Sequence, residues 1–131
     1  DSGAITFHDP VAPADLPRTL NRFDVGAFCM PPININAEYA LPNKFFDFVQ
    51  ARLAHAVGPA PEMARLVREY GLGVVSQDFS AESFTAALRT LDADAIQAGK
   101  EASHRHARDL SSTSDVATID AIVTRLLPGA A

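Results

Sequence analysis

The segment "NKFFDFVQARLAHAVGPAPEMARLVREYGLGVVS" (residues 43–76) decides the fold, because its hydrophobic pattern changes repeatedly within one stretch. Apolar residues recur one, three, four and eight positions after Phe45, which is the pattern of one helical face. A short apolar run follows at 53–58, helical spacing returns over 61–71, and another apolar run follows at 73–76. The order helix, strand, helix, strand predicts parallel strands joined by helical crossovers.

The preceding sequence extends this alternation. Apolar runs at 4–7 and 24–30 indicate two further strands, and the second run is almost entirely apolar, as in a strand buried on both faces. Residues 12–23 between them indicate a helix with Pro17 in its first turn. The sequence therefore predicts an α/β domain with a parallel sheet of about four strands and flanking helices.

The sequence after Ser80, a suitable N-cap, is helical in pattern to its end. "SSTS" at 111–114 separates a charged helical segment from a last helix that carries one apolar stripe. The stripe consists of Val116, Ile119, Ile122, Val123, Leu126 and Leu127. We interpret the chain as a single domain (1–131) with an α/β core over about 1–91 and a helical tail over about 92–131. An exposed apolar stripe would favour self-association.

The bulk composition excludes several classes of protein. The 131 residues carry a formal charge of −5, which argues against a nucleic-acid partner, although a local cluster of donors could still hold a phosphate. Cys29 is the single cysteine, so an internal disulfide is impossible and a reducing, cytoplasmic compartment is expected. No apolar run approaches the ~20 residues of a membrane span, and no signal peptide precedes the first strand-like run. The start "DSGAITFHDP" has no initiator Met, which predicts a piece of a longer protein.

The loops that leave parallel strands lie at one edge of the sheet, the carboxyl edge, where ligands bind. Segments 8–14, 31–43, 58–61 and 76–80 are therefore expected to converge there. The longest of them, 31–43, has no helical or strand period and leads into the helix that begins at Asn43. Free backbone N–H groups and the helix dipole favour an anion at such a helix start.

"Asn-Lys-x-x-Asp" at this helix start predicts a phosphate and ribose site. Lys44 supplies a compact cation for a phosphate. Asp47, one turn later, could accept hydrogen bonds from the vicinal hydroxyls of a ribose, and Asn43 lies beside both in sequence. The alternative is a surface ion pair between Lys44 and Asp47, worth a few tenths of a kcal/mol (about 0.2–0.5).

Other polar residues near the site have equally simple alternatives. Glu38 could bind a hydroxyl-rich group or be a solvated loop acid. Asn34 and Asn36 could contact the ligand or form turns. Glu62 lies in the first turn of the next helix, where an acid is expected because of the helix dipole.

Histidines and sequence motifs give no further site. His104 and His106 face different directions on a helix, which makes them a poor metal pair, and His55 in an apolar run indicates a core histidine. His8 follows the first predicted strand and would lie at the ligand edge. No Cys/His metal spacing, G-x-G-x-x-G, P-loop or G-x-S-x-G motif occurs.

Three segments together resemble the carboxyl-terminal domain of GT-B glycosyltransferases of the group 1 or family 4 type. They are "FHDPVAPADLPRTLNRFDVGAF" (7–28), "NAEYALPNKFFDFVQARLA" (36–54) and "GPAPEMARLVREYGLGVVSQDFS" (58–80). Their order matches that family: a strand, a "DVG" segment, a "PNKFFD" helix, an "EM" helix and "GLGVV". The resemblance covers about residues 5–91 and implies a partial Rossmann-like domain.

The resemblance implies a nucleotide-diphosphate-sugar donor site in this chain. In such families two acids follow a Glu-x7-Glu pattern, and the second, which matches Asp47, holds the ribose. The position eight residues earlier is Tyr39, so Glu38 departs from the pattern by one residue. Lys44 and the backbone from Leu41 to Lys44 would face the diphosphate, and Glu62 matches an acid that is frequent at that helix start.

The resemblance also implies that the parent protein transfers a sugar, as a hexosyl or related transferase, to a glycan or lipid-linked acceptor. The acceptor site and the catalytic base would belong to an amino-terminal domain, so this chain alone would be inactive. Helix dipole and cation, with no cofactor and no required metal, would stabilise the leaving diphosphate. The parent would lie in the cytoplasm or at the inner face of the membrane.

Two other interpretations stay open. The chain could be a non-catalytic α/β module of flavodoxin-like or receiver-like topology that binds a protein partner, although such a module does not need the polar loop 31–43. It could also keep the fold of a glycosyltransferase domain without its ligand site, as the offset at Glu38 suggests.

Overall fold

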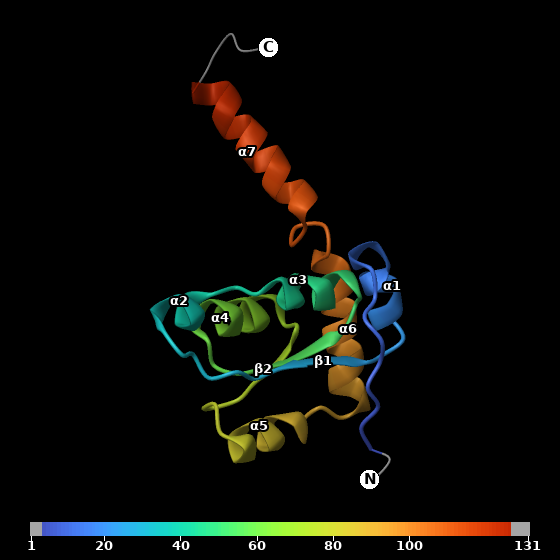
Figure 1. Cartoon of the computed structure of the whole chain (residues 1–131). Coiled ribbons are helices and arrows are strands. Elements are labelled where there is room, and N and C mark those ends of the chain that lie inside the picture. The colour runs from blue at the N-terminus through green and yellow to red at the C-terminus, as the bar shows by residue number, and fades with distance from the viewer. Residues whose placement is uncertain (1–3, 127–131) are drawn as a thin grey trace.

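The computed structural model describes residues 4–126 as an α/β fold around an open, three-stranded parallel sheet (Figure 1). The strands lie in the order β1 (Val25–Phe28), β2 (Ala54–Val57) and β3 (Gly73–Val75). In the ladders Val25 lies beside Ala54, and His55 lies beside Gly73. All four side chains of the central strand β2 are buried, as expected for a strand covered on both faces.

Helices cover both faces of this sheet and the amino edge, the end at which its strands begin. Figure 1 shows α3 and α4 on one face, α5 on the other, and α6 across the end where the strands begin. The helices are η1 (Pro13–Asp15, 3-10), α1 (Leu16–Leu20), α2 (Ile35–Tyr39), α3 (Asn43–Gln50), α4 (Pro61–Tyr70), α5 (Ala81–Leu88), α6 (Ala93–His106) and α7 (Ser112–Leu126). The architecture is consistent with a Rossmann-like fold, with three strands.

The predicted first strand, 4–7, does not form, so the expected count of about four strands is wrong. The segment is irregular and exposes its apolar side chains, with Ile5 73% and Phe7 93% accessible. Its sequence has strand-like residues, but a strand also needs a neighbour for its backbone hydrogen bonds. The segment instead passes the beginning of β1, where the His8 ring centroid lies 6.0 Å from that of Phe23.

The stretch 31–43, expected to be an irregular loop, contains the short helix α2. Its N-cap is Asn34, whose side-chain oxygen accepts a hydrogen bond from the amide of Ala37 at 2.8 Å. Five residues make less than two helical turns, so α2 is too short to produce a recognisable apolar period. Asn34 thus serves the backbone, which was one of its two predicted roles.

The main helices of the central segment are confirmed. α3 begins at Asn43 and buries Phe45 and Val49, and α4 begins at Pro61. Gly71 ends α4 with a left-handed φ of 65°, the conformation that glycine adopts without a Cβ penalty. Ser80 caps α5 by accepting the amide of Ser83, as the sequence predicted.

Helix α6 packs closely on the amino edge, where the strands begin. A Cβ added to Gly99 would lie 2.7 Å from the carbonyl oxygen of Leu72 and 2.9 Å from Cβ of Ala54. The buried Ser103 hydroxyl donates to the carbonyl of Leu53 at 2.7 Å. Small residues on α6 therefore let this helix close the amino edge.

The last helix, α7, extends away from the body of the molecule (Figure 1). The stripe predicted from sequence is exposed from Val116 to Leu126, and its last member, Leu127, lies outside the described residues. No helix within residues 4–126 is long and apolar enough to cross a membrane.

Candidate functional site at the carboxyl edge

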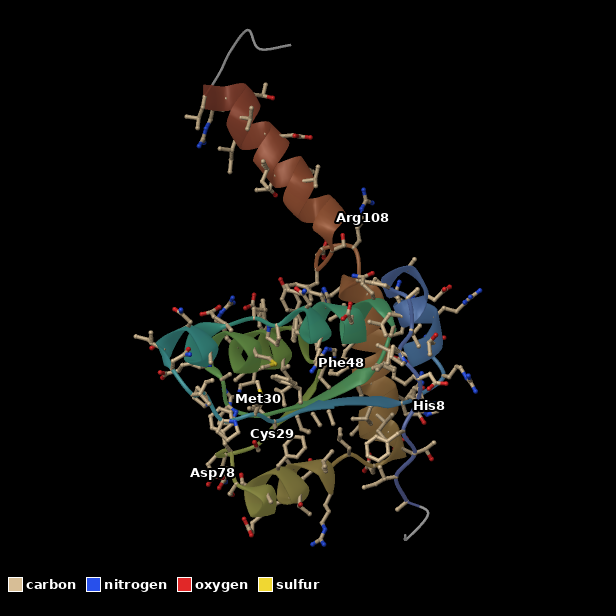
Figure 2. All side chains as sticks on the ribbon, in the orientation of Figure 1. His8, Cys29, Met30, Phe48, Asp78 and Arg108 are labelled. Carbon is tan, nitrogen blue, oxygen red and sulfur yellow. The ribbon has the colours of Figure 1, made fainter. Side chains whose placement is uncertain are left out.

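The loops that leave the three strands meet at the carboxyl edge. A Cβ on Gly58, after β2, would lie 2.7 Å from the ring of Phe79 and 3.2 Å from Sγ of Cys29, so loops from all three strands are in contact. Figure 2 shows Cys29 and Asp78 near this end of the sheet and His8 at the opposite end. Residues 4–7 form no strand, so segment 8–14 does not leave a strand at this edge, and the predicted placement of His8 there is wrong. Val11 and Pro13 of the same segment nevertheless line a cavity beside α3.

The amino terminus of α3 lies at this edge without a cap. Its N-cap residue is Pro42, and no side chain bonds to the first-turn amides. The first four N–H groups of a helix have no partner within the helix, and they carry the positive end of the dipole. This helix start is therefore suited to an anion in chemical terms.

Two charged side chains on the first turns of α3 have no ionic partner among the side chains that the structure describes. The Lys44 ammonium lies 5.3 Å from the centroid of the Phe28 ring, at the last residue of β1. Neither Lys44 nor Asp47 forms a salt bridge with a side chain of residues 4–111 or 116–126, so the predicted alternative, a surface ion pair between them, is absent. Asp47 is half-buried, and its carboxylate also lacks any side-chain hydrogen bond within that range.

Asn43 and Asp47 line the same cavity, of about 700 Å³, between the start of the chain, α3 and the end of α6. The carboxylate of Asp47 is the charged group of its lining. The lining residues are Val11, Pro13, Leu16, Asn43, Phe46, Asp47, Gln50, Leu110 and Ser111. An apolar wall beside amide and carboxylate groups suits a ligand with one flat apolar part and several hydroxyls.

The other end of α3 is held by side-chain hydrogen bonds. Gln50 donates to the carbonyls of Ala107 (2.7 Å) and Leu110 (3.0 Å), which ties α3 to the end of α6. Asn21 donates to the carbonyl of Ala51 at 2.7 Å, which ties α3 to α1. These bonds fix the cavity walls around Asp47.

Arg52 terminates α3 in a left-handed conformation, with φ of 62°. Its guanidinium donates to the carbonyls of Val49 (3.1 Å) and Gln50 (2.7 Å) in the last turn of α3. Side-chain hydrogen bonds therefore cap the end of this helix but not its start.

The remaining predicted site residues do not join this cavity. Asn36 is exposed and Glu38 half-buried on α2, and neither lines the cavity. Leu41 packs against the hydrophobic core. Glu62 forms an ion pair with Arg65 at 3.1 Å on the surface of α4, which agrees with its structural alternative.

A second, smaller cavity of about 90 Å³ lies on the other side of the start of α3. Its lining is apolar and comes from the end of β1, α2 and the start of α4. The residues are Phe28, Met30, Pro31, Pro32, Ala37, Ala40, Pro42, Ala60 and Met63. It therefore offers a contact for an apolar group and no polar recognition.

The loop after β3 satisfies its own polar groups. The Ser80 hydroxyl and amide both donate to the carboxylate of Asp78 and lower the pKa of that exposed group. The Ser76 hydroxyl donates to the carbonyl of Asp78 at 2.8 Å. This acid is thus used in the turn before α5.

His55 lies under α3 in the centre of the sheet and is fully buried, which confirms its prediction as a core histidine. Burial lowers the pKa of its imidazole to about 4, against the opposing effect of the Phe45 carbonyl. Its Nε2 lies 3.3 Å from that carbonyl oxygen, and Nδ1 is buried without a hydrogen-bond partner. The ring is therefore neutral near pH 7, and Nε2 carries the proton.

No cluster of three or more metal-ligating side chains occurs in the part of the chain that the structure describes. His104 contacts the Arg52 guanidinium, whereas His106 packs on the Tyr70 ring at 4.7 Å between centroids. The two histidines have separate surroundings, as their spacing predicted.

Sequence patterns identified Asn43, Lys44 and Asp47 but not the walls around them. Val11 and Leu110 line the cavity from segments far from α3 in sequence, and no local pattern connects them. The contact of Phe28 with Lys44 was not predicted either, although an aromatic residue at the end of an apolar strand could have indicated it. Comparison with known protein families, curated proteins and solved structures found no match for this chain.

Proposed function

We propose that this chain is the donor-binding part of a glycosyltransferase of the GT-B type, which binds a nucleotide-diphosphate sugar at the start of α3. Transfer to a glycan or lipid-linked acceptor would need a further domain in a cytoplasmic parent protein, so the chain alone would bind the donor without turnover. The proposal combines the resemblance of residues 5–91 to that family with the geometry of the site.

One observation carries the proposal: the start of α3 at the carboxyl edge has no side-chain cap, and its charged side chains Lys44 and Asp47 form no ion pair with the described side chains. The diphosphate would lie on the first-turn amides of α3 beside Lys44. The ribose hydroxyls would donate to Asp47, and the base would lie against the apolar wall of the larger cavity. Glu38 and Glu62 have weaker support, because one lies outside the cavity and the other is paired with Arg65.

The test is an NMR titration of backbone amides with UDP, GDP and ADP in turn. Binding of one nucleotide should shift residues 41–47 together with the distant cavity wall at Leu110. Asp47→Ala should weaken that binding by about 1–3 kcal/mol, through lost charge-assisted hydrogen bonds, and leave the melting temperature almost unchanged.

Glu82→Ala is the matched control, since Glu82 is also an acid in the first turns of a helix but lies on α5, on the other face of the sheet. It should bind the nucleotide as the wild type does. Absence of shifts with all three nucleotides at millimolar concentration would contradict the proposal, as would equal losses in both variants.

A second candidate, a protein-interaction module that self-associates, is favoured by the stripe on α7. Val116, Ile119 and Leu126 are 56%, 58% and 67% exposed. Sedimentation equilibrium of the wild type and of Ile119→Glu tests it: a dimer that the substitution dissociates would support this function, and a monomer at every concentration would exclude it.

A further inference from the structure

His55 is an unexpected residue for its place in the core. Its side chain is fully buried in the central strand, its neighbours are aromatic, and one of its two ring nitrogens has no hydrogen-bond partner. Burial of an unpaired polar atom costs free energy, and an aliphatic side chain of similar size would avoid that cost. The histidine must therefore be examined for what its hydrogen bond to α3 provides.

That contact joins the sheet to α3. Nε2 of His55 lies 3.3 Å from the carbonyl oxygen of Phe45, and the imidazole packs against the rings of Phe45 and Phe48 at 5.1 and 5.8 Å between centroids. The Phe48 ring in turn covers Gly26 of β1, where an added Cβ would lie 2.4 Å from ring carbons. His55, Phe48 and Gly26 thus form one stack between β2, α3 and β1.

No charged side chain among the described residues acts on the imidazole. The elements packed around it present the two aromatic rings and the Phe45 carbonyl from α3, the backbone of Leu53 just before β2, Gly26 from β1 and Gly73 from β3. Burial and backbone carbonyls are the influences on its proton affinity within residues 4–126. Its protonation is therefore controlled by how tightly α3 covers it.

We propose that His55 is a positioning residue for α3, the helix that carries Lys44 and Asp47. The imidazole N–H, bonded to the Phe45 carbonyl, fixes the position of α3 along the sheet and so holds these two side chains in place. Packed rings resist separation but permit small sliding movements, whereas a hydrogen bond loses strength when its distance or angle changes. The expected effect of His55 on nucleotide affinity rests on the proposed function, whereas its effect on the position of α3 does not.

Two substitutions of matched size separate the hydrogen bond from the packing. His55→Gln keeps an N–H donor on an unbranched side chain, and His55→Met has similar length without a donor. In the wild type, the aromatic ring over Gly26 should displace the Hα resonances of that glycine from their usual range. His55→Met should move them back toward that range, and His55→Gln should keep most of the displacement.

Nucleotide affinity provides the second readout. His55→Met should bind roughly tenfold more weakly than the wild type, because a misplacement of about 1 Å is costly in a pre-organised site, and His55→Gln should recover most of the loss. Ser76→Ala is the control: it removes another hydrogen bond from a buried side chain to a backbone carbonyl, that of Asp78 after β3, and should leave the Gly26 resonances unchanged.

The outcomes distinguish this inference from the proposed function. Equal Gly26 resonances in the wild type and in His55→Met would overturn the positioning role. If the wild type binds no nucleotide, the proposed function fails while the Gly26 readout still decides the role of His55. If both variants fail to fold, the imidazole ¹⁵N resonances of the wild type at pH 7 decide: a proton on Nε2 would support the hydrogen bond to the Phe45 carbonyl, and a proton on Nδ1 would overturn it.

Discussion

The two edges of the sheet differ in how completely their polar groups are used. At the amino edge, α6 packs against the strands, Ser103 bonds to the carbonyl of Leu53 just before β2, and Arg52 bonds to the carbonyls at the end of α3. At the carboxyl edge, the start of α3 has no side-chain cap, and Lys44 and Asp47 have no ionic partner among the side chains of residues 4–111 and 116–126. The polar groups at the amino edge are thus used within the fold, whereas Lys44 and Asp47 at the start of α3 are the groups that the proposed function assigns to a ligand.

The largest loss of stability should follow Gly73→Ala, at the beginning of β3. A Cβ there would lie 1.9 Å from the carbonyl oxygen of His55, and the backbone φ is 158°, a value that residues with a side chain rarely adopt. Backbone atoms cannot move aside, so we expect a loss of about 4 kcal/mol or more in the free energy of unfolding. Urea denaturation measures it, and a loss below about 1 kcal/mol would show that this edge tolerates displacement.

Acid should produce the next largest effect, through His55. Its pKa is about 4 in the folded state against 6.5 for the unperturbed group, so between these values the unfolded chain binds a proton that the folded chain does not. The stabilisation is complete above pH 6.5 and is lost as pH falls toward 4, by about 3 kcal/mol.

The measurement is urea denaturation of the wild type and of His55→Met at pH 7, 5.5 and 4.5. The other titratable groups are the same in both proteins. The difference between the two proteins in the pH dependence of the free energy of unfolding therefore reports on His55 alone. The wild type should lose more stability on acidification, and parallel curves for the two proteins would contradict the assignment.

Sequence patterns predicted the elements whose pattern is local. α3 and α4 each span at least two turns with an apolar face, and Ser80 and Gly71 mark helix ends by chemistry that works residue by residue. The run 4–7 has strand-like residues, but strand formation depends on a partner that its sequence does not specify.

The same division applies to the candidate site. Lys44 and Asp47 could be assigned to a helix start because both belong to one short motif. The cavity around Asp47 could not be predicted, because its walls come from Val11, Leu110 and α3, which only the tertiary structure brings together.

A moderate effect is expected at Arg52, where α3 ends near the amino edge. Arg52→Ala loses two hydrogen bonds to helix carbonyls and keeps a φ of 62° that disfavours a Cβ, so we expect a loss of about 2 kcal/mol. Arg52→Gly loses the same bonds but adopts that φ freely and should be about 1 kcal/mol more stable than Arg52→Ala. Thermal denaturation of the two variants tests this order. Equal stability of the two would mean that the positive φ at position 52 does not destabilise Arg52→Ala.

The smallest effects should lie at the carboxyl edge. Asp47→Asn keeps the shape of a half-buried side chain that has no ion pair within residues 4–126, so we expect its free energy of unfolding to change by less than about 0.5 kcal/mol. Lys44→Ala loses one cation–π contact with Phe28, worth about 0.5–1 kcal/mol at an exposed site.

Urea denaturation of both variants at low and high salt completes the comparison of the edges. Small changes in the free energy of unfolding that do not depend on salt would agree with two charges that have no partner inside the protein. Keeping them unpaired would then bring a benefit only when a ligand binds. A loss above about 1.5 kcal/mol in Asp47→Asn would reveal a structural role for this carboxylate. In that case the carboxyl edge would be stabilised in the same way as the amino edge, and the argument from unpaired groups to a ligand would fail.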